Sequence, residues 1–291
     1  MLACLLGRAG HHTPGSVTLT TGTSSLRYPS ILSTDTTPCA ANTGAFICRT
    51  HVPDSVRPVR ADIPEFLQAT RASYDAVAEA YAAEHPDSLA GRPLESALLT
   101  VFVELARAHG GSAQAPVADL GSGPGYVAAR LHALGLPVFG VDVSPRMVAL
   151  ARRAHPELRF HVGSMTALDL PDRTLGGIVA LYSIIHVPDD HLPSVFAEFH
   201  RVLVPGAPVL LAFQSGDEDG HQRLTERFGQ EIALDCHWRT PEAVAEHLAE
   251  AGLELYARVL REPEDGEQRP RAFLLARRPS LPPGPVTDRP A

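Results

Sequence analysis

A glycine-rich stretch, Asp119-Leu-Gly-Ser-Gly-Pro-Gly125, constrains the fold more than any other feature of the sequence. Glycine adopts backbone dihedrals that other residues avoid, and its missing Cβ lets the backbone approach a ligand closely. The residues around it read as a strand from Val117 to Leu120 and a helix from Tyr126 to Leu134, which Gly135 ends. A strand that runs through a glycine turn into a helix is typical of nucleotide-binding α/β proteins.

The segments beyond this turn alternate between strand and helix patterns. Val138 to Asp142 fits a second strand, and Ser144-Pro145 caps and starts the next helix. Later patterns predict strands at Leu158 to Val162, Gly177 to Tyr182 and Pro208 to Leu211, a helix from His191 to Leu203, and a hairpin of Leu253 to Leu260 with Ala272 to Ala276. This alternation predicts an α/β fold with a mostly parallel sheet covered by helices on both faces.

Three further helices are expected outside this core pattern. Asp62-Ile-Pro-Glu65 offers an N-cap, an early proline and a reciprocal glutamate for a helix that runs towards Tyr81. A second helix has one apolar face, made of Leu94, Leu98, Val101, Phe102 and Leu105. After the fifth strand, Thr240-Pro241 starts a helix that Gly252 ends.

Composition divides the chain into three parts. Residues 61–278 carry the alternating pattern and can bury a core, since 44% of the 291 residues are hydrophobic. Residues 1–60 are rich in Ser, Thr, Pro and Gly without a sustained period. We therefore expect a disordered N-terminal extension, with an organelle transit peptide as the alternative. Residues 279–291 read as a flexible Pro-rich tail.

Charge and residue usage disfavour several functions. The net charge of −8 gives no general attraction for a polyanion, so a nucleic-acid partner is not expected. No apolar run approaches the roughly 18 residues of a membrane span. The four cysteines form no CxxC pair, so no metal site is expected and the thiols fit a reducing cytoplasm. All 25 basic residues are arginine, which excludes a lysine Schiff base and a lysine phosphate loop.

The spacing of the glycines and the acid before them discriminate between ligands. Dehydrogenases that bind NAD use GxGxxG, whereas Gly121, Gly123 and Gly125 alternate. Asp119 places a carboxylate at the strand end, where it would repel a pyrophosphate and attract the cationic amino group of S-adenosylmethionine (SAM). Asp142, at the end of the second strand, can accept hydrogen bonds from both ribose hydroxyls, which SAM and NAD sites share.

Several motifs in a fixed order resemble the class I SAM-dependent methyltransferase family, in its small-molecule branch. Asp119 to Gly125 matches the first motif of that family and Val141 to Pro145 its second. Gly163 to Pro171 looks like the third, and Val204 to Pro208 like the loop before strand five. The resemblance covers about residues 62–278.

This resemblance implies a Rossmann-like seven-stranded sheet of order 3-2-1-4-5-7-6 with an antiparallel last strand, and SAM across the carboxyl ends of strands one, two and four. The implied cofactor-binding residues are Tyr74, Tyr81, Asp119, Gly121, Ser122, Gly123, Gly125, Asp142, Val143, Met147, Ser164, Met165 and Leu181. Many relatives carry an acid after strand three that holds the adenine amino group. Ser164 stands there instead, which leaves the Ser164 hydroxyl, the Met165 backbone and Asp169 as alternatives.

The chemistry of transfer requires few residues, because alignment and water exclusion do most of the work. His186 follows strand four, where many relatives carry a histidine near the methyl, and is the one general-base candidate. The alternative is a histidine that only supports its loop. Tyr74 and Tyr81 share a helix face and close over the methionine end in similar enzymes, or simply pack that helix.

The segment from Gln214 to Arg239 follows strand five, where this family often builds substrate contacts. Its candidates for acceptor contact are His221, Phe228, His237 and Trp238, and the alternative is a solvated linker with one docked aromatic.

The sequence thus predicts an enzyme that moves the methyl group of SAM to an O, N or C atom of a small metabolite, as a monomer or homodimer. A non-catalytic SAM-binding protein is the second hypothesis. A nucleotide-dependent oxidoreductase is the third, disfavoured by the glycine spacing and by Asp119.

Overall fold

A computed structural model describes residues 63–85, 89–109, 115–264 and 266–280 of the chain. The expected N-terminal extension of residues 1–60 and most of the expected C-terminal tail lie outside these ranges. The described elements are α1 (Glu65–Glu84), α2 (Pro93–His109), β1 (Val117–Leu120), α3 (Tyr126–Ala133), β2 (Val138–Asp142), α4 (Pro145–Ala154), β3 (Arg159–Val162), β4 (Gly177–Leu181), the 3-10 turns η2 (Ile184–His186) and η3 (Asp189–His191), α5 (Leu192–Val202), β5 (Pro208–Gln214), β6 (Gly220–Arg227), β7 (Gln230–Trp238), α6 (Pro241–Glu250), β8 (Glu254–Arg261) and β9 (Arg271–Arg277).

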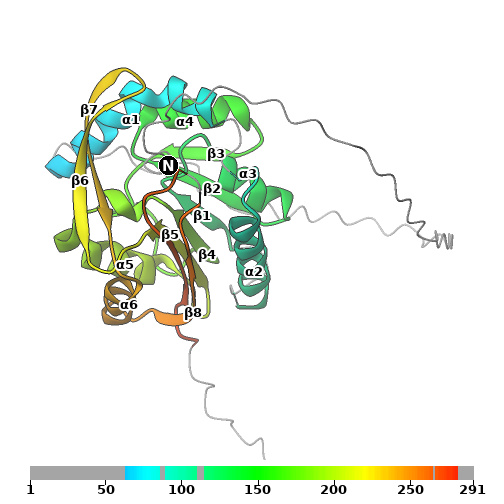
Figure 1. Cartoon of the computed structure of the whole chain (residues 1–291). Helices are drawn as coiled ribbons and strands as arrows, with labels where there is room; N and C mark the ends of the chain where they lie inside the picture. Colours follow the sequence, from blue (N-terminus) through cyan, green and yellow to red (C-terminus); the bar gives the residue numbers. More distant parts are fainter. Residues whose placement is uncertain (1–62, 86–88, 110–114, 265, 281–291) are drawn as a thin grey trace, which may run out of the picture. The chain divides into compact units, whose positions relative to one another are not determined.

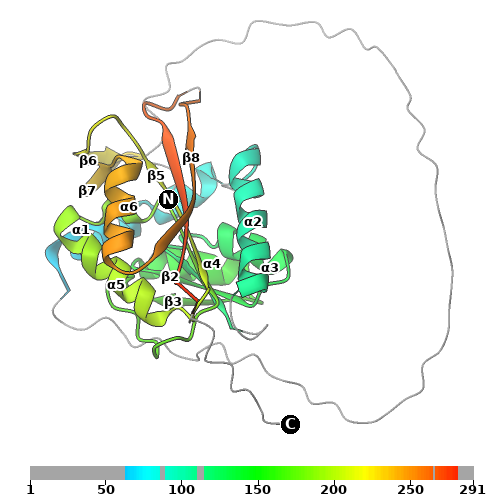
Figure 2. The same ribbon diagram turned by 90° about the horizontal axis from the view of Figure 1, so that it is seen from below.

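One seven-stranded sheet forms the centre of the described part, in the order β3-β2-β1-β4-β5-β9-β8. The first five strands of that order pair in parallel, and β9 runs antiparallel to both of its neighbours. Helices α2 and α3 cover one face and α5 and α6 the other (Figures 1 and 2). The predicted α/β class, strand order and terminal hairpin are therefore confirmed.

The alternate glycine spacing follows from the backbone of the turn after β1. Gly121, Gly123 and Gly125 all have positive φ, at 75°, 53° and 92°. A side chain at such angles is strained, whereas glycine adopts them freely. The turn therefore needs glycine at every second residue.

Two of the three residues predicted to cap a helix N-terminus are confirmed as caps. Ser144 caps α4 by accepting a hydrogen bond from the Met147 amide, and Thr240 caps α6 through Ala243. The prediction for α1 is wrong, because that helix begins at Glu65 with Pro64 as its N-cap and has no side-chain cap. Asp62 lies outside the described residues.

The predicted apolar face of α2 needs one correction. Val101 is 43% exposed, whereas Leu99, Phe102 and Val103 are almost fully buried. The helix packs against β5 and so buries a face that is rotated away from Val101. The helical spacing of apolar residues alone does not show that Val101 is exposed and that Leu99 and Val103 are buried.

The segment after β5 is the main difference from the sequence prediction. β5 extends to Gln214 rather than Leu211, and β6 and β7 then form a separate antiparallel hairpin, not a linker. This hairpin packs on α1, and the two share a second apolar cluster that includes Tyr74, Tyr81 and Leu234.

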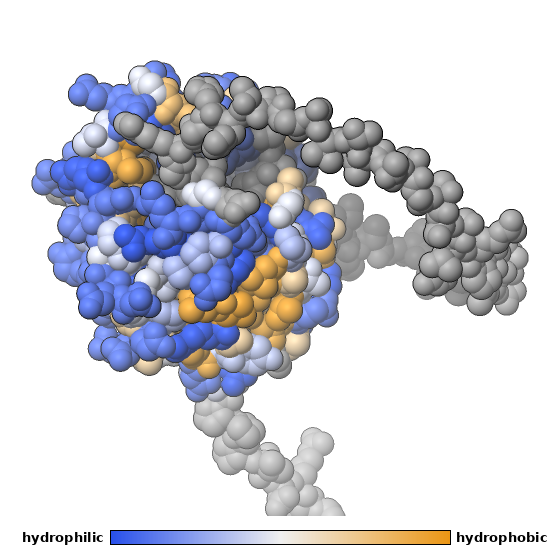
Figure 3. Space-filling model, in the orientation of Figure 1, coloured by the Kyte–Doolittle hydropathy of each residue, from blue (hydrophilic) through white to orange (hydrophobic). Residues whose placement is uncertain are grey.

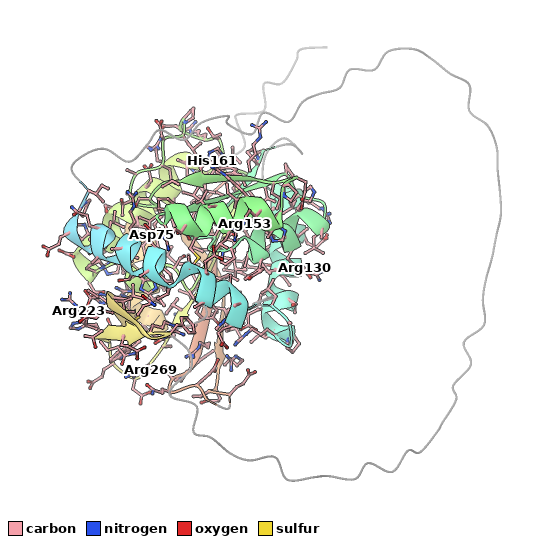
Figure 4. The ribbon with its side chains drawn as sticks, turned by 90° about the horizontal axis from the view of Figure 1, so that it is seen from above. Asp75, Arg130, Arg153, His161, Arg223 and Arg269 are labelled. Atoms are coloured by element: carbon pink, nitrogen blue, oxygen red, sulfur yellow. The ribbon has the colours of Figure 1, made fainter. Side chains whose placement is uncertain are left out.

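α1 is fixed to the start of α4 by one acid, Asp75. Its Oδ1 accepts hydrogen bonds from the Ser144 hydroxyl at 2.6 Å and from the Arg146 amide at 3.1 Å. Figure 4 shows Asp75 where α1 and α4 lie side by side. Ser144 is fully buried, so its hydroxyl depends on this partner.

The surface carries apolar residues at a few positions. In Figure 3 one face is mostly hydrophilic, with a single larger apolar patch over the strands at its centre. The large apolar side chains that stay exposed are Leu255, Tyr256 and Leu260 of β8 and Val101 of α2. No helix within the described ranges combines the length and the hydropathy that crossing a bilayer requires.

We expect Asp75→Ala to lower the free energy of unfolding by about 1–3 kcal/mol, because it leaves the buried Ser144 hydroxyl without its acceptor. Glu79→Ala is the matched control on the same helix, since its pair with Arg153 is largely exposed. That control should cost less than about 0.5 kcal/mol. Urea unfolding of both variants measures the difference, and equal costs would contradict the role given to Asp75.

Candidate cofactor site

Two cavities meet at Gly121, at the carboxyl edge of the sheet. We call them cavity A, which reaches towards α2, and cavity B, which reaches towards the loop after β3. They offer about 440 and about 410 Å3 of space, open solvent included. Gly121 lines both, so the two cavities adjoin at this residue, and we treat them together as the candidate site.

Asp119 lines cavity A and is 2% exposed. Its Oδ2 accepts a hydrogen bond from the Ala128 amide at 3.0 Å, near the start of α3. Burial raises the pKa of this carboxyl to about 7, and the nearby Asp142 adds to the shift while the Ala128 amide opposes it. A cation in cavity A would therefore stabilise the ionised form of Asp119.

Asp142 connects the glycine turn to the next helix. Its two carboxylate oxygens accept hydrogen bonds from the amides of Gly123 at 2.7 Å and Ser144 at 2.8 Å. Burial raises its pKa, against the effect of these two amides. The linings of the two cavities do not include Asp142, Gly123 or Gly125, and the Asp142 carboxylate anchors the glycine turn beside them.

Cavity B carries the residues expected at the adenine end. Val143, Ser164 and Met165 line it, as do Leu67 and Thr70 from α1. The Ser164 hydroxyl shares a 2.8 Å hydrogen bond with that of Thr166. Asp169 is exposed and does not line the cavity, so of the three adenine alternatives the geometry favours Ser164 and Met165.

Cavity A is lined by two residues that the sequence interpretation missed. Glu95, in the first turn of α2, is 3% exposed and accepts a hydrogen bond from the Tyr182 hydroxyl at 3.2 Å. Tyr182 follows β4 and has a positive φ of 53°. Strained backbone of this kind is common at ligand sites. The predicted Ser122 and Leu181 line the same cavity.

His186 lines cavity B and is held at both ring nitrogens. Nδ1 donates to the Asp235 carbonyl at 2.7 Å, because a carbonyl oxygen can only accept. Nε2 then accepts from the Tyr74 hydroxyl at 2.8 Å. Burial lowers the pKa of His186 to about 4, so the ring is neutral near pH 7 with its basic nitrogen directed at Tyr74.

Tyr74, Tyr81 and Met147 lie in the apolar cluster between α1, α4 and the hairpin, and they line neither cavity. The rings of Tyr74 and Tyr81 meet edge to face at 6.3 Å. Tyr74 reaches the site through His186, whereas Tyr81 stacks on His85. The structure thus brings Tyr74 to the site and places Tyr81 in the packing of α1.

Arg239 is a third residue that sequence reasoning missed. Its side chain is 2% exposed and donates to the Ile184 and Val187 carbonyls at 3.2 and 2.5 Å and to the Asp189 carboxylate at 2.6 Å. These contacts fix both ends of the turn that carries His186. An arginine between a strand and a helix has no sequence signal for this role.

The four candidates for acceptor contact lie on the hairpin and line neither cavity. His221 and His237 stack on each other at 5.4 Å, Arg269 lies over the Trp238 ring at 3.5 Å, and Phe228 contacts Arg227 and His85. Their expected contact with an acceptor stays a prediction.

Known proteins similar in sequence to this chain match the region that carries the glycine turn and His186. A family profile described as "Methyltransferase domain" matches residues 117–206, from β1 to the turn before β5. This match indicates a methyltransferase domain in that part of the chain. The demethylmenaquinone methyltransferase of Chlorobaculum parvum is 33% identical over 97 residues, which cover 33% of this chain and 39% of the relative. The trans-aconitate 2-methyltransferase of Variovorax paradoxus is 32% identical over 139 residues, covering 46% and 50%.

The chain therefore spans half or less of the length of these curated relatives. Solved structures agree on the fold. The CcbJ methyltransferase of Streptomyces caelestis aligns with a TM-score of 0.53 at 20% identity, covering 73% of this chain and 99% of CcbJ. The [4+2]-cyclase SpnF aligns at 0.54 and 19%, covering 75% and 98%. Because a cyclase shares the fold, the activity has to be argued from the site.

We expect Asp119→Asn to stabilise the ligand-free protein, by about 1–3 kcal/mol at pH 8. The folded-state pKa of Asp119, about 7, is raised above the ordinary 3.8. Ionising it therefore destabilises the folded state increasingly as the pH rises from about 4 to 8. Urea unfolding at both pH values tests this, with the exposed Asp169→Asn as control. No gain at pH 8, or an equal gain at pH 4, would contradict the buried charge.

Proposed function

We propose that cavities A and B bind SAM, with the amino-acid end in cavity A and adenine in cavity B. The charge distribution supports this proposal most strongly. Among the described residues that line the two cavities, the charged side chains are the acidic Glu95 and Asp119, and no arginine lines either cavity. SAM carries a sulfonium and an ammonium group, whereas a dinucleotide pyrophosphate would be repelled.

Two buried hydroxyl groups fit the same proposal. Ser122 lines cavity A and Ser183 lines cavity B, and the Oγ atoms of both are buried and have no hydrogen-bond partner among the described residues. A buried hydroxyl without a partner costs free energy, and a polar ligand in the site would remove that cost. The fold agrees, since the glycopeptide N-methyltransferase MtfA, solved with SAM, aligns with a TM-score of 0.50 at 18% identity, covering 62% of this chain and 87% of MtfA.

The roles of the individual residues follow from this placement. Asp119 attracts the ammonium group, the Gly121 backbone allows close approach, and Ser164 with Met165 contacts adenine. Asp142 is the candidate for the ribose hydroxyls, since a carboxylate oxygen that already accepts one amide retains a further lone pair. Val143 lines the ribose and adenine side, and Leu181 the methionine side.

We further propose that the domain methylates an O, N or C atom of a small metabolite. SAM supplies an electrophilic methyl group when it is bound. The protein aligns the acceptor and excludes water, and α1 and the hairpin cover the carboxyl edge for this purpose. The named relatives, which are methyltransferases for demethylmenaquinone and trans-aconitate, support a small-molecule acceptor. A SAM-binding protein without catalysis is the alternative, and SAM-dependent turnover separates the two.

His186 is the proposed general base for an acceptor that carries a proton. Its neutral ring and the tautomer set by Asp235 direct the basic Nε2 towards Tyr74. The acceptor proton would reach that nitrogen through the Tyr74 hydroxyl or after Tyr74 moves. The alternative, a histidine that only joins α1, η2 and β7, uses the same contacts.

Calorimetric titration with SAM, S-adenosylhomocysteine and NADH tests the cofactor. We expect binding of the first two ligands alone, and a loss of affinity of about tenfold or more in Asp142→Ala, which loses the ribose contacts and the anchor of the glycine turn. Thermal shift should follow the same order, because a ligand bound only by the folded state raises its stability. Stabilisation by NADH alone would refute the proposal.

A metabolite screen for release of S-adenosylhomocysteine tests the enzyme, and His186→Gln then tests the base. We expect turnover to fall by about 10²–10⁴-fold, the usual contribution of general-base catalysis, while SAM affinity changes less than about threefold. Near-normal turnover in the variant would remove His186 from the chemistry. Arg130→Gln is the control, because this side chain is exposed on α3, where Figure 4 labels it.

A further inference from the structure

Glu95 is an acid that neither the motifs nor the family match accounts for. It lies in the first turn of α2, outside the matched residues 117–206, yet it is 3% exposed and lines cavity A beside Asp119. An acid in the first turn of a helix ordinarily stays in solvent, where it interacts with the helix dipole. Burial of this carboxylate therefore needs another explanation.

Among the described residues, Glu95 has one hydrogen bond and one longer ion pair. Its Oε1 accepts the Tyr182 hydroxyl at 3.2 Å. Arg92 Nη1 lies 3.6 Å away and is shared with Glu267, at 3.7 Å, so it makes a hydrogen bond to neither. Glu267 is in turn paired with Arg261 at 2.9 Å and Arg271 at 3.5 Å. None of these three arginines is among the described residues that line cavity A.

The lining of cavity A around Glu95 differs from this cluster, because its charged residues are acidic. Glu95 and Asp119 come from separate elements, α2 and β1, and line the same space together with Gly121 and Leu181. No basic side chain among the described lining residues faces them. Two carboxylates that line the same cavity both stabilise a cation that is placed between them. An ammonium group has three donors and can bind both acids at once.

We propose that Glu95 binds the α-ammonium group of the cofactor together with Asp119, so that α2 completes the amino-acid end of the site. This inference rests on SAM being the ligand. Tyr182 then acts as a positioning residue, because its hydroxyl donates to the Glu95 carboxylate and the residue itself lines cavity A. The chemical class that cavity A selects is a primary ammonium ion.

The test compares ligands with and without that group, by calorimetry on the full-length chain. Glu95→Gln keeps the shape of the side chain and its acceptor for Tyr182 and removes only the charge. We expect SAM, S-adenosylhomocysteine and decarboxylated SAM, which all carry the ammonium, to lose about tenfold in affinity. 5′-Methylthioadenosine, which has no amino-acid tail, should change less than twofold.

Two further variants separate the effect of the Glu95 charge on binding from an effect on the stability of the fold. Glu104→Gln, on the exposed side of the same helix, should leave every affinity unchanged. Tyr182→Phe keeps the Glu95 charge and should weaken SAM by about threefold, again without an effect on 5′-methylthioadenosine. This second variant tests the same point if Glu95→Gln unfolds, which its melting temperature without ligand would reveal.

The outcomes distinguish the inference from the proposed function. If the unmodified chain binds none of the four ligands, the proposed function fails. If it binds SAM but Glu95→Gln leaves SAM affinity unchanged, or weakens 5′-methylthioadenosine equally, Glu95 does not bind the ammonium group and the inference alone is overturned. A loss confined to the ligands that carry the ammonium supports it.

Discussion

The carboxylate of Asp142 is the interaction on which the rest of the site depends. It accepts the Gly123 amide and the Ser144 amide, so one side chain fixes the glycine turn after β1 and the cap of α4 after β2. Ser144 in turn donates to Asp75, which fixes α1. A single chain of hydrogen bonds therefore runs from the cofactor turn to α1, with the two Asp142 bonds buried and the bond from Ser144 to Asp75 partly buried.

The second constraint is the burial of several carboxyl groups at the site. Burial raises the pKa of both Asp119 and Asp142, and cavity A adds Glu95 without a basic residue in its described lining. Buried carboxylates destabilise a protein without a ligand, which is the common relation between stability and function at binding sites. The same charge gives selectivity for a cationic cofactor over a dinucleotide. Binding and folding thus oppose each other at Asp119.

The sequence predicted the central sheet well because each of its strands is a short apolar segment with a clear boundary. β1 and β2 have the predicted bounds, and Ser144 and Thr240 cap the predicted helices. The hairpin β6–β7 was missed because its strands alternate charged and polar residues, such as Arg223 and Glu226, which do not resemble a buried strand. Its apolar residues become meaningful only against α1, and that contact is tertiary.

Part of the candidate site follows from the topology of the sheet. Asp119, Gly121, Ser164 and His186 lie at or after the carboxyl ends of strands. Parallel strands bring these ends to one edge, so the four residues lie near the same edge of the sheet. Glu95, Tyr182 and Arg239 could not be found in this way. Glu95 looks like an ordinary first-turn acid, the positive φ of Tyr182 has no sequence signal, and Arg239 acts on carbonyl groups 52 and 55 residues away.

The most direct test of this account is the proton balance of SAM binding at pH 7, measured by calorimetry in two buffers of different ionisation enthalpy. With its pKa at about 7, Asp119 is half protonated before binding, and a cation beside it shifts it to the ionised form. The unmodified chain should therefore release about half a proton more than Asp119→Asn does. Equal proton balances in the two proteins, or no binding of SAM by either, would contradict a cofactor site organised around buried carboxylates.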